Sequence, residues 1–319
     1  MKRIVAVLLA SCLVMAGACG GNSGTTDSRK KLRFAVIPKA LDLPVFNYAK
    51  IGAEQAAKEL GNVEILFNAP LIADHRKQKE MLESFIARKV DGIAISCTNA
   101  EYLTPAINRA VEAGIPVVTW DSDAPNSKRY AFYGIDDLAA GRILGEQAIK
   151  LLKGQGEVAI MTSAGSTNLE RRLEGIQEAL KKAPKIKVVE VFDLKENPMG
   201  VADVITEGAQ KYPELDAWLS TGGLPVFNRK ATAALDPAKT KLLSFDTIDP
   251  ALDLLREGKV QVLIGQKYFG WGSQPVRLLY DIKQGKMPAT PIIDSGVDIV
   301  TRDNVDQYAE QWKKMAAGQ

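Results

Sequence analysis

Residues 90–96 read VDGIAIS and residues 114–125 read GIPVVTWDSDAP, and these two stretches decide the fold. Each contains a short apolar run, at 92–95 and 116–120, with the length and composition of a buried strand. Between them, residues 102–113 have apolar side chains at three- and four-residue spacing, which predicts a helix. Continuous apolar strands joined by a helix predict a parallel sheet that helices cover on both faces.

The same alternation continues along the chain in both directions. Further strands are expected at 32–37, 63–67, 158–161, 187–192, 217–219, 241–245, 260–264 and near 297–300. Further helices are expected at 45–60 and 75–89 and near 168–182, 199–211, 225–235, 249–257 and 271–284. The pattern restarts after a break, so the predicted fold class is α/β with two doubly wound parallel-sheet lobes. A barrel of eight strand–helix units is the alternative topology.

Composition excludes several classes of protein. The 319 residues are enough for about two domains, and 46% hydrophobic with 25% charged residues is typical of a globular protein. The formal net charge is only +3, and the longest basic run is 29–31, so we expect no nucleic-acid partner. The chain has three cysteines and one histidine, so we expect no metal site and no cofactor.

The first thirty residues have the pattern of an export signal. Lys2 and Arg3 precede an uncharged, mostly apolar stretch at 4–18, which is too short to span a bilayer comfortably. Small residues then lead directly into Cys19, a pattern that resembles the lipobox of bacterial lipoproteins. We therefore expect a signal peptide at 1–18, lipidation of Cys19 and a flexible tether at 19–31. Lipidation at Cys12, or plain cleavage after residue 18, are the alternatives.

Ligands of open parallel sheets bind beyond the carboxyl ends of the strands. The predicted strands lead there into Ser96, Asp121, Phe245-Asp246 and Gln266. Carboxylates accept hydrogen bonds from hydroxyl groups, amides both donate and accept, and aromatic faces pack against C–H surfaces. This set of side chains indicates a carbohydrate ligand.

The order of these residues is similar to that in a known family. Asp121, then Asn168-x-x-x-Arg172-x-x-Gly175, then Phe245-Asp246 and then Gln266 resemble the ribose/galactose-type sugar-binding proteins of bacterial ABC importers. The resemblance extends from about residue 31 to residue 305. It implies two lobes joined by three chain crossings, with sugar bound in the cleft between them. The first lobe would be 32–135 plus 267–295, and the second 136–266 plus 296–319.

The resemblance also implies roles for individual residues. Asp121, Arg172, Asp246 and Gln266 match positions that bond sugar hydroxyls, and Phe46 and Phe245 match positions that sandwich the ring. The other expected ligand-binding positions are Ser96, Asn168 and Gly222, with Asp42, Tyr268 and Trp271 as possible cleft lining. This chain departs from the family pattern at Gly222, where relatives have Asn, at Ser122, where they often have Arg, and at Val45, where they have an aromatic. We therefore expect a ligand other than ribose.

The resemblance implies the binding component of an ABC importer. We expect a monomer that binds a monosaccharide or related polyol by lobe closure and delivers it to a membrane permease. We expect it outside the cytoplasm, in the periplasm or on the outer cell surface, and held to the membrane through lipid only. A sugar-sensing protein that presents its ligand to a receptor kinase or chemoreceptor is the alternative. We do not expect an enzyme, because the single histidine, His75, stands at the start of a predicted helix and no G-x-S-x-G or Walker-type glycine loop is present.

Overall fold

A computed structural model of the chain describes residues 31–316. The predicted signal peptide and Cys19 lie outside the described residues. The described part holds two six-stranded sheets, with the orders β11-β5-β4-β3-β1-β2 and β12-β10-β9-β8-β6-β7. This confirms the predicted fold class of two parallel-sheet α/β lobes.

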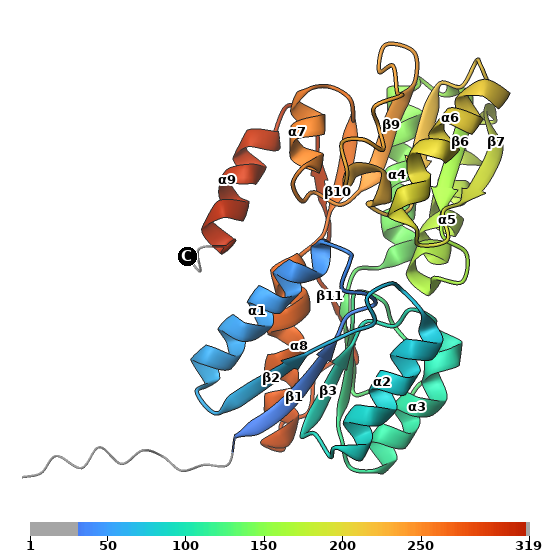
Figure 1. The fold of residues 1–319 in the computed structure, drawn as a ribbon. Coiled ribbons are helices and arrows are strands. Elements are labelled where there is room, and N and C mark those ends of the chain that lie inside the picture. The colour runs from blue at the N-terminus through green and yellow to red at the C-terminus, as the bar shows by residue number, and fades with distance from the viewer. Residues whose placement is uncertain (1–30, 317–319) are drawn as a thin grey trace, which may run out of the picture. The chain divides into compact units, whose positions relative to one another are not determined.

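The first sheet is parallel throughout. Its strands are β1 (Leu32–Ile37), β2 (Val63–Phe67), β3 (Gly92–Ile95), β4 (Val117–Trp120), β5 (Ala131–Gly134) and β11 (Ile292–Asp294). Its helices are α1 (Val45–Leu60), α2 (His75–Ala87), α3 (Ala100–Glu112) and α8 (Tyr268–Lys283). Figure 1 shows α1 and α8 on one face of this sheet and α2 and α3 on the other.

The alternation of side chains along β1 explains this arrangement. Phe34 and Val36 join the hydrophobic cluster that contains the buried residues of α1 and α8. Ala35 and Ile37 point to the opposite face and join the cluster of α2 and α3. A strand that is buried on both faces reads as a continuous apolar run, which is why the sequence predicts it so clearly.

The second sheet is parallel except at its edge, where β12 pairs antiparallel with β10. Its strands are β6 (Gln155–Thr162), β7 (Lys185–Asp193), β8 (Ala217–Ser220), β9 (Lys241–Phe245), β10 (Val262–Gly265) and β12 (Asp298–Val300). The remaining helices are α4 (Asp137–Leu151), α5 (Thr167–Leu180), α6 (Val201–Lys211), α7 (Ala251–Arg256) and α9 (Val305–Ala316), with short 3₁₀ turns at Pro198–Gly200 and Leu224–Val226. Among the residues described, no helix is both long and apolar enough to cross a bilayer.

The chain passes between the two sheets three times: from β5 to α4, from β10 to α8, and from β11 to β12. The sequence analysis did not predict β5, α4 or β11. The first crossing joins β5 to α4, and the last begins at β11. β5 and β11 are only four and three residues long, so they are too short to show a period.

The helix expected near 225–235 is wrong. Only Leu224–Val226 form a 3₁₀ turn there, and the chain continues in turns. Asn228 Oδ1 accepts a hydrogen bond from the backbone N–H of Lys230 at 2.9 Å, and Asp236 Oδ1 accepts one from Ala238 at 3.0 Å. These side chains give the backbone an alternative to helical hydrogen bonds, which the apolar spacing alone does not reveal.

Candidate functional site

A cavity lies where the carboxyl ends of strands from both sheets meet, the place where open parallel sheets bind their ligands. From the first lobe it is lined by Lys39, Leu43, Val45, Phe46, Asp121 and Trp271. From the second lobe it is lined by Asn168, Leu169, Arg172, Glu196, Gly222, Gly223, Leu224, Phe227, Asp246 and Gln266. The lining combines charged side chains of both signs with aliphatic and aromatic ones.

The two aspartates of the cavity occupy equivalent places in the two sheets. Asp121 follows β4 directly and Asp246 follows β9 directly, and both have a left-handed backbone, with φ of 58° and 75°. This conformation is costly for most residues, and Asp tolerates it better than most. Burial raises the pKa of both carboxyl groups, while Lys39 and Arg172 oppose that rise for Asp121 and Arg172 opposes it for Asp246. A hydroxyl-rich ligand that donates hydrogen bonds to these buried carboxylates would replace the water they have lost.

Arg172 is held from three sides. Its Nε donates to Asp137 Oδ1 at 2.8 Å, one terminal nitrogen donates to the carbonyl of Thr221 at 3.1 Å, and the other to Gln266 Oε1 at 3.1 Å. The guanidinium lies over the ring of Phe245, 4.3 Å from its centroid. A guanidinium has five N–H donors, so two remain for a ligand. Burial raises the pKa of Asp137 to about 7, although the adjacent Arg172 opposes that rise.

Asp246 belongs to the same network. Its Oδ1 accepts hydrogen bonds from Gln266 Nε2 and from the hydroxyl of Tyr268, both at 2.9 Å. Gln266 therefore connects Asp246 with Arg172, since it donates to one and accepts from the other. A carboxylate, an amide and a guanidinium are thus oriented together before any ligand contacts them.

Lys39 connects the two lobes across one end of the cavity. It follows β1 in the first lobe, is almost fully buried, and donates to Asn168 Oδ1 at 2.7 Å and to Ser166 Oγ at 3.0 Å. Glu196 Oε1 lies 3.8 Å from its Nζ and accepts a 2.6 Å hydrogen bond from Ser166. The buried ammonium group is therefore compensated by groups of the opposite lobe.

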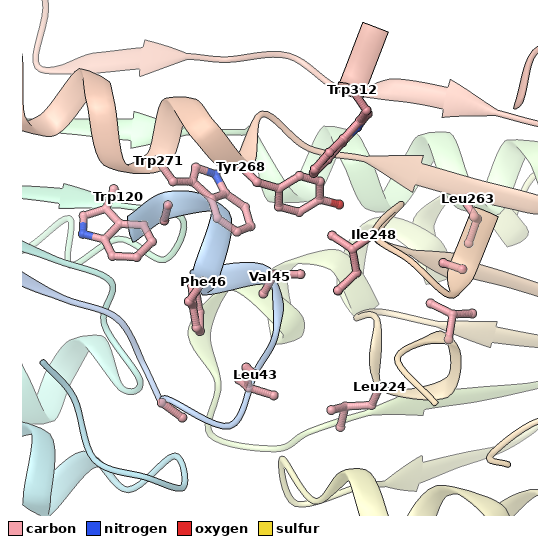
Figure 2. Close-up of a cluster of buried hydrophobic side chains, with 14 of the residues drawn as sticks. Leu43, Val45, Phe46, Trp120, Leu224, Ile248, Leu263, Tyr268, Trp271 and Trp312 are labelled. Carbon is pink, nitrogen blue, oxygen red and sulfur yellow. The ribbon is translucent and has the colours of Figure 1, made fainter. Parts of the chain in front are cut away.

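Aromatic rings form the first-lobe wall (Figure 2). The ring of Phe46 meets that of Trp120 edge-on at a centroid distance of 5.6 Å, and Trp271 lies 6.1 Å from Phe46. These three side chains are at most 4% exposed. The packing fixes Phe46 and Trp271, which line the cavity, in one orientation.

Two close helix–helix contacts, each made possible by a glycine, position these side chains. A Cβ at Gly141 of α4 would clash with the backbone of Arg172, and a Cβ at Gly272 of α8 would clash with the backbone of Ala49. The absence of side chains lets α4 approach α5 closely, and α8 approach α1. Arg172 is carried by the first pair, and Phe46 and Trp271 by the second.

The residues predicted from sequence fall into three groups. Eight of them line the cavity: Phe46, Asp121, Asn168, Arg172, Gly222, Asp246, Gln266 and Trp271. Ser96, Phe245 and Tyr268 are buried behind this lining. Ser96 donates to Asp121 Oδ2 at 2.6 Å, and Tyr268 supports Asp246. Phe245, which was expected to stack on a sugar ring, instead lies fully buried beneath the Arg172 guanidinium. Asp42 is exposed and is not part of the lining.

Sequence reasoning missed several lining residues. Lys39 lies two residues after a predicted strand and could have been found by the same strand-end argument that selected Asp121. Glu196 lies in a loop beyond β7 and had no such signal. The apolar lining residues Leu43, Leu169, Leu224 and Phe227 were not distinguishable from ordinary core residues by their type.

Comparison with known proteins shows a family match and several proteins of similar sequence and fold. Residues 34–287 match the periplasmic binding protein domain. The D-allose-binding periplasmic protein of Escherichia coli is 28% identical over 290 residues, which cover 85% of this chain and 93% of that protein. An ABC transporter solute-binding protein from Burkholderia graminis, solved in complex with D-arabinose, is 33% identical, with a TM-score of 0.82 and coverage of 88% of this chain and 98% of that one. AraP, an arabinose-binding protein from Geobacillus stearothermophilus, is 32% identical, with a TM-score of 0.71 and coverage of 87% and 99%.

The family match spans most of the chain, and the solved structures align with nearly the whole of theirs. The chain therefore belongs to the periplasmic binding protein family, which confirms the resemblance to ribose/galactose-type sugar-binding proteins that its motifs indicated.

Proposed function

We propose that this protein binds a monosaccharide or related polyol in the cavity and delivers it to the permease of an ABC importer. The observation that supports this most directly is the convergence of Asp121 from one lobe with Asp246 and Arg172 from the other on a single cavity. Carboxylates and a guanidinium are the strongest hydrogen-bonding partners that a protein offers to hydroxyl groups. Phe46 and Trp271 add aromatic surface for the C–H faces of a ring.

Binding should be coupled to lobe closure. A ligand that contacts both lobes makes its full set of hydrogen bonds only when the lobes are together, so it stabilises that state over an open one. The hydrogen bonds from Lys39 to Ser166 and Asn168 would form in the same state. We propose that a permease recognises this closed form and that the protein acts as a monomer.

We propose further that the ligand is released chemically unchanged. Asp121 accepts from Ser96, Asp246 accepts from Gln266, and Arg172 donates to a backbone carbonyl. This arrangement is suited to holding a ligand rather than to activating a nucleophile. Incubation of a bound sugar with the purified protein should return the same sugar, as measured by mass spectrometry and chromatography. Recovery of a phosphorylated, oxidised or isomerised product would contradict this part of the proposal.

Calorimetric titration tests the binding site. At least one member of a panel of pentoses, hexoses and sugar alcohols should bind with a dissociation constant in the micromolar range or tighter. Asp246→Ala should weaken that binding at least about tenfold, because a hydrogen bond to a buried charged group contributes about 1.5–3 kcal/mol. The matched control is Asp303→Ala, an exposed position outside the cavity. Equal affinities for the two variants would reject the assignment of Asp246.

The export signal and lipid anchor are proposed from sequence alone. We propose cleavage before Cys19 and lipidation of that cysteine. The lipid would then hold the exported protein to a membrane surface outside the cytoplasm. Intact-mass analysis of the protein from membranes should show a lipidated species that begins at Cys19. The variant Cys19→Ala should lose the lipid mass, whereas Cys12→Ala should keep it if Cys12 is part of the signal peptide.

A further inference from the structure

One part of the cavity wall is formed by apolar side chains from both lobes. Leu43 and Val45 come from the segment that leads into α1, and Leu169, Leu224 and Phe227 come from the second lobe. Leu43, Val45 and Leu224 belong to one hydrophobic cluster that continues across the lobes, as Figure 2 shows. This part of the wall contrasts with the network of Arg172, Gln266 and Asp246.

Gly222 leaves room beside this apolar wall. A Cβ built at Gly222 would meet only the methyl groups of Leu169, at 3.4 and 3.9 Å. Its backbone does not have a positive φ, so glycine is not required there by conformation. The space at Gly222 is therefore bordered by methyl groups and remains open to an apolar atom of a ligand.

The backbone acceptors at this position are already in use. The carbonyl of Gly222 accepts hydrogen bonds from Ser220 Oγ at 2.8 Å and from Ser244 Oγ at 3.0 Å. The carbonyl of Gly223 accepts from the N–H groups of Val226 and Phe227 at 2.9 and 3.0 Å. A ligand hydroxyl that pointed at Leu169 and Gly222 would find no free carbonyl to accept its proton, whereas a hydroxyl on the side of Gly223 would meet the carboxylate of Asp246, whose Oδ2 lies against that glycine.

We infer that the ligand carries a methyl group at the end that faces Gly222 and Leu169, with a 6-deoxyhexose as the simplest such sugar. This inference rests on the proposed function and narrows its substrate class. A methyl group that lies against the methyl groups of Leu169 at Gly222 gains apolar contact, whereas a hydroxymethyl group at the same place loses its hydrogen bonds to water. The hydroxyl-bearing remainder of the ring would contact Asp121, Arg172 and Asp246.

Titration of stereochemically matched pairs tests the inference. Each pair holds a 6-deoxyhexose and its parent hexose: L-fucose and L-galactose, D-fucose and D-galactose, L-rhamnose and L-mannose, and 6-deoxy-D-allose and D-allose, with pentoses titrated beside them. The tightest ligand should be a 6-deoxyhexose that binds at least about tenfold more tightly than its parent, a factor typical of one group in an apolar pocket. The inference is overturned, while the proposed function stands, if the tightest ligand is a pentose or an unmodified hexose. It is also overturned if the tightest 6-deoxyhexose and its parent hexose bind with equal affinity. If no sugar of the panel binds, the proposed function is overturned and the inference with it.

Two variants then locate the effect. Gly222→Asn places an amide in the space beside Leu169, and Leu169→Asn replaces the methyl groups themselves. Either change should reduce the preference for the 6-deoxy member to about onefold or reverse it. The matched control, Gly200→Asn, makes the same substitution at a glycine outside the cavity whose φ is also negative, and it should keep the full preference for the 6-deoxy member. Because Gly222 can accept a side chain without a positive φ, its variant tests the inference even if Leu169→Asn fails to fold. An unchanged preference in Gly222→Asn would place the methyl group elsewhere and overturn the inference.

Discussion

The two lobes present the same element to the cavity but support it differently. Each sheet places an aspartate in a left-handed conformation directly after a strand, Asp121 after β4 and Asp246 after β9. Asp121 accepts one side-chain hydrogen bond, from Ser96. Asp246 accepts two and is connected through Gln266 to Arg172.

The side chains around the two aspartates differ in the contacts that they can make with a ligand. The first lobe surrounds its aspartate with rings, since Phe46, Trp120 and Trp271 pack against one another. Asp246 is surrounded by directional donors and acceptors, with Gln266 and Arg172 from the second lobe and Tyr268 from α8 of the first. A sugar has both hydroxyl groups and C–H faces, so a cavity between unlike walls can satisfy both at once. We therefore expect the second lobe to contribute most of the binding free energy, while the first lobe contributes shape and closure.

Removal of Arg172, the centre of the second-lobe network, should cause the largest loss of sugar affinity. Arg172→Ala should weaken sugar binding by about 100-fold or more, because it removes charge-assisted hydrogen bonds to the ligand and frees Asp246 and Gln266 to move. The measurement is calorimetric titration, with thermal unfolding to confirm that the variant is folded. The matched control is the adjacent, exposed Arg171→Ala, which loses only a surface pair with Glu174. A similar loss in both variants would mean that Arg172 has no special part in binding.

A change in the first-lobe wall should have a smaller effect. Phe46→Leu keeps an apolar side chain but removes the ring, so affinity should fall about fivefold, the order expected from the loss of an aromatic contact. The control is Phe85→Leu, a buried aromatic in the cluster of α2 and α3, where affinity should not change. A loss larger than that of Arg172→Ala would reverse the division of roles between the lobes.

A third effect, on stability rather than on sugar binding, concerns Asp137, which pairs with Arg172 at the first chain crossing. The pKa of Asp137 rises from 3.8 to about 7, chiefly because the carboxyl group is buried. The folded state therefore holds this proton more tightly than the unfolded chain. The stability that this residue contributes is complete below about pH 4 and is lost as pH rises toward 7. In Asp137→Asn, the free energy of unfolding should thus fall less between pH 4 and pH 7 than in the wild type.

Urea unfolding at a series of pH values, without ligand, measures this difference. Asp121 and Asp246 also have raised pKa values, and they contribute a slope of the same sign in both proteins. Subtracting the two curves isolates Asp137. Identical slopes would mean that the pKa of Asp137 stays near its ordinary value in the folded protein, so that its pairing with Arg172 outweighs burial.

Much of the fold could be predicted because its signals are local. The strand β3 is apolar throughout, β1 is apolar from Phe34 to Ile37, and α1 has the expected spacing. Burial and secondary structure can therefore be read from adjacent residues. The segment at 225–235 misled the same reasoning, because turns made by Asn228 and Asp236 compete with a helix that its apolar residues would allow.

The site was only partly predictable. Asp121, Asp246 and Gln266 could be selected because they stand directly after apolar runs, where parallel sheets place their ligands. Phe245 and Asp246 are neighbours in the chain, yet only the second lines the cavity. Phe245 ends β9 and is fully buried, whereas Asp246 follows the strand in a left-handed backbone conformation. Residue type alone does not say which of two adjacent residues faces the ligand.

Three features could be predicted from the sequence alone: the alternation of strands and helices, the carboxylates at strand ends, and the protein family. Each depends on the types and order of nearby residues. Only the tertiary structure decided that Lys39 would meet Asn168, 129 residues away, and that Arg172 would lie between Asp137 and Gln266. Such contacts depend on how closely packed helices and crossing segments bring distant backbone together. That distance is set by whole-lobe packing, which no local pattern encodes.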